Sequence, residues 1–202
     1  ERAIFLAEAR DVAALLGVAP TVDGAATGAA LRAATAGPLR LLHLSCHGYF
    51  HGQDALASGV VLAGDGGGPA VYTARQFMQQ RLPVELVTLS ACQTGLSGSL
   101  GGDEMAGLSM ALLTAGARSL LLGLWSVESV TTAALMRDFY RRLWAGGQSL
   151  SASPSKAEAL RQTVLALRRG ELDDDIQRLF AAVLAEVPPE ARARYEPYVA
   201  RL

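Results

Sequence analysis

The sequence is poor in cysteine, nearly free of lysine and without a long hydrophobic run. Two cysteines provide no disulfide framework, which fits a reducing, cytoplasmic location. No apolar run approaches the roughly 18 residues that cross a bilayer. The first residues also lack the charged-then-apolar layout of a signal peptide. A formal net charge of −1 argues against partners recognised by bulk electrostatics, namely nucleic acid and anionic membranes.

Apolar residues are what the sequence has in quantity. They make up 50% of the 202 residues, which is enough to bury the core of one domain. Alanine is abundant, and all basic residues except Lys156 are arginine, a bias typical of GC-rich bacterial genomes. This bias carries no information about function.

An apolar segment rich in β-branched residues spans residues 84–95, with the sequence VELVTLSACQTG. Its apolar residues leave no polar face, which is typical of a central parallel strand with helices on both sides. In an open α/β sheet, ligands bind outside the carboxyl ends of the strands, so Cys92 lies where chemistry is usually done. A strand-end cysteine taken alone, however, is more often a small buried hydrophobe.

A second apolar segment, residues 39–51, leads into Cys46, His47 and Gly48. A cysteine hydrolase needs a thiolate, an imidazole that assists proton transfer, and backbone N–H groups that hold the oxyanion. His47 precedes Cys92 by 45 residues, close to the spacing of roughly 50 in caspases. One crossover fits between the two segments and would lay the two strands side by side. The sequence therefore predicts that His47 and Cys92 meet at one sheet edge.

Four segments, in this order, resemble the CHAT domain family of caspase-like cysteine peptidases: HLSCHGYF, LSACQTG, GDEMAGLSMALLTAGARSLLLGLWSV and LMRDFYRRL. The resemblance runs from about Glu8 to about Leu167 and fails beyond Gly170. It implies that His47 and Cys92 form the catalytic dyad. It also implies a protein substrate cut at one or a few sites, often in bacterial defence, and activity gated by a sensor or an activating partner.

The resemblance implies a three-layer α/β sandwich of the caspase type, with a mostly parallel central sheet and helices on both faces. Residues 39–45, 84–90 and 118–125 are predicted as adjacent parallel strands, and residues 53–69 as a hairpin at the sheet edge. Helices are predicted at residues 3–16, 25–36, 73–80, 103–115, 131–144 and 156–169.

Residues 1–170 are assigned to a CHAT-like peptidase domain and residues 171–202 to a helical extension packed on it. Family members usually carry a strand before the first helix, and they close with a short aromatic-rich His-Pro strand. Neither strand is evident in the sequence. The chain is therefore expected to be part of a longer protein or to lack disordered segments.

The expected chemistry assigns a role to three residues at the catalytic edge. Cys92 attacks the scissile carbonyl, and His47 protonates the leaving amine. The N–H groups of Gly48 and Cys92 bind the oxyanion. A third, orienting acid is not evident. Family members usually carry an acid where this chain has Ser129.

Three acidic residues, Asp103, Glu104 and Glu128, are predicted to lie near the same edge and to bind substrate. They favour a basic side chain immediately before the cut. Asp103 and Glu104 also suit a purely structural role, because acids stabilise the first turn of a helix.

No metal and no cofactor are expected. Four candidate ligands cluster within nine residues: His43, Cys46, His47 and His51. A four-ligand zinc site normally draws on pairs from separate knuckles, and the sequence has no second Cys/His pair. His43 is interpreted as a hydrogen-bonded strand histidine, and Cys46 as packing on the opposite side from His47. The segment GDGGG lacks the lysine and hydroxyl residue of a phosphate loop.

The sequence therefore predicts a cysteine endopeptidase that acts on a protein substrate. Two alternatives stay open. A catalytically silent module would keep the caspase-like fold for binding or assembly, although the presence of both His47 and Cys92 argues against it. A cysteine hydrolase acting on a small amide or ester would need a deep, enclosed pocket.

Overall fold

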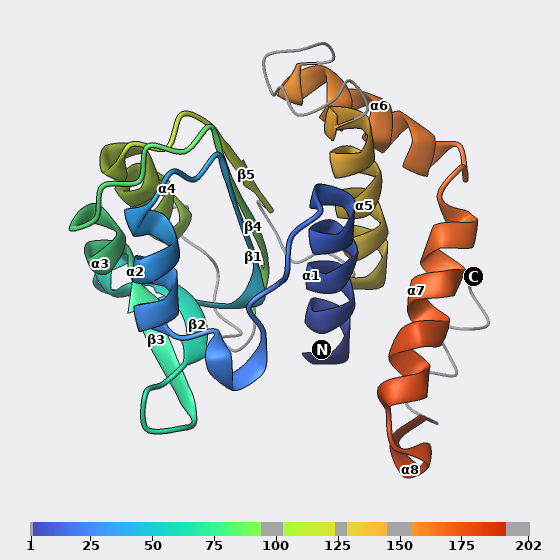
Figure 1. Cartoon of the computed structure of the whole chain (residues 1–202), viewed down its shortest axis with the longest axis horizontal. Helices are drawn as coiled ribbons and strands as arrows, with labels where there is room; N and C mark the ends of the chain where they lie inside the picture. The colour runs from blue at the N-terminus through green and yellow to red at the C-terminus, as the bar shows by residue number, and fades with distance from the viewer. Residues whose placement is uncertain (1, 94–102, 124–128, 145–154, 193–202) are drawn as a thin grey trace. The chain divides into compact units, whose positions relative to one another are not determined.

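The computed structural model describes residues 2–93, 103–123, 129–144 and 155–192. The chain forms two compact units (Figure 1). The sheet unit comprises Thr21–Val127, and the helical unit combines Glu1–Pro20 with Glu128–Leu202. Each unit buries a hydrophobic core of its own.

The sheet unit is built on strands in the order β3-β2-β1-β4-β5. Their bounds are β1 (Leu41–Tyr49), β2 (Gly59–Ala63), β3 (Pro69–Thr73), β4 (Leu86–Gln93) and β5 (Leu120–Leu122). β1, β4 and β5 are adjacent and parallel, as predicted. The predicted edge hairpin is also present, because β2 pairs antiparallel with both β3 and β1.

The prediction of a mostly parallel sheet is wrong. Two strand pairings are parallel and two are antiparallel, so the sheet is mixed. The physical reason is the short connection between β2 and β3, which cannot provide the crossover of a dozen or more residues that parallel strands need. Gly67 and Gly68 adopt φ angles of 82° and 80° in this turn, a region that favours glycine. The turn closes through a hydrogen bond from Gly64 N to Gly68 O of 2.8 Å.

Three helices belong to the sheet unit: α2 (Gly28–Ala36), α3 (Ala74–Met78) and α4 (Asp103–Ala115). All three contribute to one core on one face of the sheet (Figure 1). A capping box begins α3, in which Thr73 and Gln76 each bond the other's backbone N–H. Gly116, with a φ of 117°, ends α4 as predicted. The unit is a mixed α/β fold, and the expected helices on both faces stay a prediction.

The core of the sheet unit follows the alternation of the strands. Leu42 of β1 and Val87 and Leu89 of β4 point into it and are buried. Phe77 of α3 packs edge-on against Tyr72 of β3, with ring centroids 4.9 Å apart. Burying a large apolar side chain contributes about 1.5–3 kcal/mol, so this face supplies much of the unit's stability.

Strand β1 is longer than predicted. It continues past Ser45 through Cys46, His47 and Gly48 to Tyr49. Gly48 and Tyr49 find antiparallel partners in β2, and this pairing extends the strand where a turn was expected. His47 therefore lies inside a strand and not in a loop.

Close packing at Gly107 joins α4 to the segment that follows β1. A Cβ at Gly107 would lie 2.7 Å from Ala55 Cβ and 3.0 Å from Ala55 O. Ala55 begins a short 3-10 helix, η2 (Ala55–Ala57), in the connection between β1 and β2. Only glycine allows this approach without a shift of backbone.

The helical unit contains α1 (Arg2–Leu16), α5 (Ser129–Trp144), α6 (Lys156–Arg168), α7 (Asp173–Glu186) and α8 (Pro189–Arg192). These positions agree with the predicted helices. α5 packs against α1, α6 and α7. Its predicted anchors Met136, Phe139, Tyr140 and Leu143 are buried, whereas Leu135 is half-buried. None of the described helices combines the length and the apolarity that a bilayer-spanning segment requires.

Ionic contacts tie the helices of this unit together. Arg137 of α5 reaches Asp11 of α1 at 3.6 Å and Asp175 of α7 at 3.4 Å. Asp138 of α5 is fully buried and accepts hydrogen bonds from Arg141, Arg142 and Thr163. Burial raises the pKa of Asp138, but the hydrogen bonds from Arg142 and Arg141 outweigh this, so its pKa is lowered.

Candidate active site

His47 and Cys92 are register partners on neighbouring parallel strands. His47 lies near the carboxyl end of β1, and Cys92 near the carboxyl end of β4. Neighbouring strands are about 4.8 Å apart, so the fold brings the backbones of the two predicted dyad residues side by side. The side chain of Cys92 lies outside the part of the chain that the structure describes.

The position of Cys92 follows from the burial of β4 and the residues before it. Val84, Leu86 and Val87 are at most 2% exposed, as the apolar segment predicts for a central strand. Backbone bonds hold this strand on the side of β5, with Arg118 N donating to Val84 O at 2.9 Å and Val87 N to Ser119 O at 3.0 Å. A strand fixed on both sides is a rigid support for a reactive residue.

Alternation along β1 separates its two faces. Leu42, Leu44 and Cys46 pack into the core beneath α2, α3 and α4. The packing of Cys46 in this core is as predicted. His43, Ser45 and His47 therefore share the opposite face of the sheet.

A run of polar residues on this opposite face was missed by the sequence analysis. His43 pairs in register with Thr88, and Ser45 pairs with Ser90. Thr88 is fully buried and Ser90 is 7% exposed. The dominant apolar residues of this segment predict a strand without a polar face, and the register shows that β4 has one. The signal that could have revealed the run is the i, i+2 spacing of the polar residues in HLSCH and TLSAC.

His51 shapes the connection after β1. Its Nδ1 accepts a hydrogen bond from Asp54 N at 3.1 Å, and its own backbone N donates to Ser58 Oγ at 2.9 Å. Nδ1 acts as an acceptor here, and the imidazole caps a turn. Among the described residues, no group of three or more His, Cys, Asp or Glu side chains is placed to hold a metal ion.

The predicted oxyanion donors lie in regular strands. Gly48 pairs with Gln93 of β4 and with Val60 of β2, and Cys92 pairs with His47. The prediction that the N–H groups of Gly48 and Cys92 bind an oxyanion stays a prediction. Both residues do lie at the sheet edge where the resemblance places the chemistry.

The predicted substrate-binding acids fall at the limit of what the structure describes. Asp103 and Glu104 form the first residues of α4, as expected, but their side chains lie outside the described part of the chain. Glu128 lies outside the described residues altogether. Their role in substrate binding stays a prediction.

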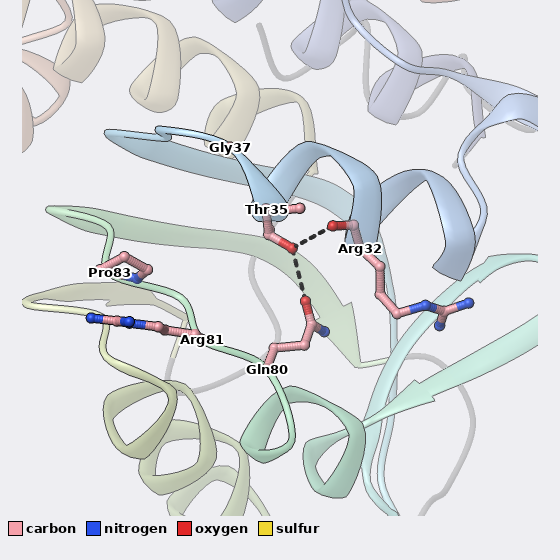
Figure 2. A pocket seen from close by; sticks show the side chains of 7 residues that line it. Arg32, Thr35, Gly37, Gln80, Arg81 and Pro83 are labelled. Carbon is pink, nitrogen blue, oxygen red and sulfur yellow. Dashed lines mark hydrogen bonds between the residues drawn. The ribbon is translucent and has the colours of Figure 1, made fainter.

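A pocket of about 300 Å³ lies at the other end of the strands (Figure 2). It is lined by Arg32, Thr35, Ala36, Gly37, Gln80, Arg81 and Pro83. Gly37 shortly precedes β1 and Pro83 shortly precedes β4, so the pocket lies near the amino ends of these strands, away from His47 and Cys92. The two arginine side chains point in opposite directions in Figure 2, and they do not converge on a common ligand position.

A hydrogen-bonded chain forms one wall of this pocket. The Thr35 hydroxyl donates to Gln80 Oε1 at 2.8 Å, and Gln80 Nε2 donates to the Tyr72 hydroxyl. Thr35 and Tyr72 are both buried. These hydrogen bonds therefore connect α2 to the residues after α3 and to β3, and their role is structural.

Two curated relatives match part of the chain. Tetratricopeptide repeat protein 28 of Mus musculus is 36% identical over 91 residues, which is 45% of this chain and 4% of the relative. Tetratricopeptide repeat protein 28 of Homo sapiens is 34% identical over 91 residues, with the same coverage of 45% and 4%. The chain thus spans a small fraction of the length of these relatives.

A family comparison covers nearly the whole chain. The sequence model of the CHAT domain family matches residues 2–199. The match includes the residues after Gly170, so the expectation that the resemblance fails there is wrong. CHAT domains are related to caspase-like peptidases, and the chain belongs to the CHAT domain family.

Proposed function

We propose that this chain is a cysteine endopeptidase domain with His47 and Cys92 as its catalytic dyad. The observation that carries the proposal is the register of β1 and β4, which pairs these two residues near the carboxyl ends of adjacent parallel strands. Membership of the CHAT domain family supports the same assignment. A three-layer caspase-like sandwich, completed by helices on the second face of the sheet, is part of this proposal.

The mechanism follows from the residue types. The Cys92 thiol transfers its proton to the His47 imidazole, and the thiolate attacks the scissile carbonyl carbon to form a carbon–sulfur bond. N–H groups of Gly48 and Cys92 stabilise the oxyanion. The intermediate collapses as the peptide C–N bond breaks, and the His47 imidazolium gives its proton to the leaving amine. Water, deprotonated by His47, then hydrolyses the thioester.

The substrate is proposed to be a protein cut at one or a few sites. A partner or sensor is proposed to gate the activity, as the resemblance to the CHAT domain family implies. The name of the two relatives refers to tetratricopeptide repeats, which are helical repeat modules. This supports control by a protein partner. A role in bacterial defence rests on the resemblance alone, and the two relatives are mammalian proteins.

The competing function is a catalytically silent interaction module. It predicts that Cys92 has the reactivity of an ordinary thiol. A peptidyl acyloxymethyl ketone separates the two readings, because it labels an activated cysteine without the need for a known substrate. The proposal predicts a covalent mass shift on the full chain that Cys92→Ala abolishes and Cys46→Ala retains. Labelling that survives Cys92→Ala would contradict it.

The role of His47 is tested in the same assay. His47→Ala should slow labelling at least about a hundredfold, the usual scale for a lost acid–base group. His51→Ala is the matched control, because His51 lies in the connection after β1 and caps a turn. If His51→Ala slowed labelling as much as His47→Ala, the assignment of the imidazole would be wrong.

A further inference from the structure

Three consecutive same-face positions of the β1–β4 pair carry polar residue types. The pairs are His43 with Thr88, Ser45 with Ser90, and His47 with Cys92. The register is unbroken from Leu41 to Gly48, so no bulge interrupts the alternation. The middle pair therefore lies directly next to the proposed dyad.

Ser45 carries the unusual hydroxyl of this run. Its Oγ is buried and has no hydrogen-bond partner within the part of the chain that the structure describes. Buried hydroxyls almost always have a partner, which can be protein or ordered water. A hydroxyl maintained in such a place, between two histidines on one face, calls for a functional explanation.

The distances favour a link to His47. Residues two apart on a strand are about 6.6 Å apart at Cα, and residues on the next strand about 4.8 Å. One water bridges side chains over such spans when several polar groups surround it. Ser45, Ser90 and the His47 ring provide these groups.

We propose that Ser45 is a positioning residue for His47. One buried water, shared with Ser90, accepts the imidazole N–H that is not used by Cys92 and donates in turn to the Ser45 hydroxyl. These bonds fix the ring orientation and stabilise the imidazolium, as the third member of a catalytic triad does. The inference deepens the proposed function and rests on it.

The surroundings explain why a hydroxyl takes this role. Neither β1 nor β4 contains Asp or Glu, so no carboxylate of these strands can orient the ring. On the face of the sheet that carries His47, the other titratable residues of β1 are His43 and Tyr49. The titratable residue of β4 at a position on this face is Cys92. A neutral hydroxyl accepts from the water bound to the imidazolium without the cost of burying a further charge.

The test measures alkylation of Cys92 by iodoacetamide from about pH 5 to about pH 9, a range that spans the usual pKa values of histidine and cysteine. All variants carry Cys46→Ala, so that one thiol is present. Ser45→Ala should lower the rate constant for alkylation of Cys92 at neutral pH about tenfold and move the midpoint of the rate–pH profile to higher pH. The reason is that the His47 imidazolium, which stabilises the Cys92 thiolate, loses the hydrogen bond that stabilises it. Ser45→Thr keeps the hydroxyl and should stay within about twofold of the parent.

Thr35→Ala is the matched control, since it removes a buried hydroxyl far from the dyad. It should lower the melting temperature and leave the pH profile of Cys92 unchanged. The inference is overturned if the Ser45→Ala profile superimposes on that of the parent, or if Ser45→Thr loses as much as Ser45→Ala. If Cys92 of the parent reacts no faster than glutathione, the proposed function itself fails and the inference with it.

Discussion

His47 of β1 and Cys92 of β4 are paired in register, one position beyond the polar pair of Ser45 and Ser90 on the same face. Two segments separated by 45 residues in the chain thus meet at adjacent strands. The parallel direction of β1 and β4 places both residues toward the carboxyl edge, where ligands of α/β sheets usually bind.

Close packing at Gly107 predicts a position that is sensitive to substitution, against the connection that follows β1. Gly107→Ala places a Cβ within 2.7 Å of Ala55 Cβ and should cost about 1–3 kcal/mol of unfolding free energy. Gly24→Ala is the matched control, because no heavy atom of another residue lies within 4 Å of the added Cβ. Urea denaturation measures both. Equal stability of Gly107→Ala and the parent would show that α4 and η2 can move apart freely.

Asp138 predicts an acid-sensitive contribution to stability. Its lowered pKa means that the carboxylate contributes fully above the ordinary value of 3.8, and that this contribution is lost as pH falls through the lower folded value. Asp138→Asn should cost roughly 2 kcal/mol at neutral pH, less than a fully buried pair, because Arg141 and Arg142 are partly exposed. The difference from the parent should narrow in strong acid.

An exposed acid on the next helix provides the comparison for Asp138. Glu158 pairs with Arg161, and the hydrogen bond from Arg161 lowers the pKa of Glu158 to about 2. Because both groups are solvated, Glu158→Gln should change the melting temperature much less than Asp138→Asn. Comparable losses would mean that burial of Asp138 is not what makes its ion pairs matter.

The hydrogen bonds that link Thr35, Gln80 and Tyr72 should contribute to the stability of the sheet unit and not to the reactivity of Cys92. Tyr72→Phe removes the hydroxyl bonded to Gln80 and should destabilise the unit by about 1 kcal/mol. Labelling of Cys92 by the acyloxymethyl ketone should be unchanged, because the pocket lies near the amino ends of β1 and β4. A fall in labelling at temperatures where the variant is fully folded would indicate that the pocket influences the dyad.

A substrate preference is expected from the three acids that the sequence predicts near the carboxyl ends of β1 and β4. Asp103, Glu104 and Glu128 predict cleavage after arginine in preference to aspartate, because a basic side chain would find opposite charge there. A peptide library analysed by mass spectrometry measures the preference. The double variant Asp103→Asn with Glu104→Gln should weaken it, and cleavage after aspartate would overturn the assignment.

The sequence predicts those elements of the fold for which one local pattern of residues is sufficient. Two apolar segments ending in small and polar residues predicted β1 and β4 as neighbours, and glycine and threonine predicted helix ends such as Gly116 and Thr73. These features are local in the chain. They carry over to the fold because buried strands and capped helices have few alternatives.

The features of the fold that the sequence did not predict depend on which strands and side chains pair with one another, and a single sequence does not specify this. The hairpin of β2 and β3 was predicted, but its antiparallel pairing with Gly48 and Tyr49 was not, so β1 was predicted too short. The i, i+2 spacing marks the polar residues of each strand in the sequence, but only the register shows that Thr88 and Ser90 lie opposite His43 and Ser45. The ionic contacts of the helical unit likewise join residues far apart in the chain, such as Arg10 and Glu186.

The most direct test of the proposed nucleophile compares the reactivity of the two cysteines in the same protein. Cys92 is proposed to lie beside the His47 imidazole, which favours a thiolate, whereas Cys46 is half-buried against the apolar core, where a thiolate is less favoured. Iodoacetamide at neutral pH, followed by peptide mapping, measures the two rates separately. Cys92 should be modified at least about tenfold faster than Cys46. Faster modification of Cys46, or equal rates for both thiols, would contradict the assignment of Cys92 as the nucleophile.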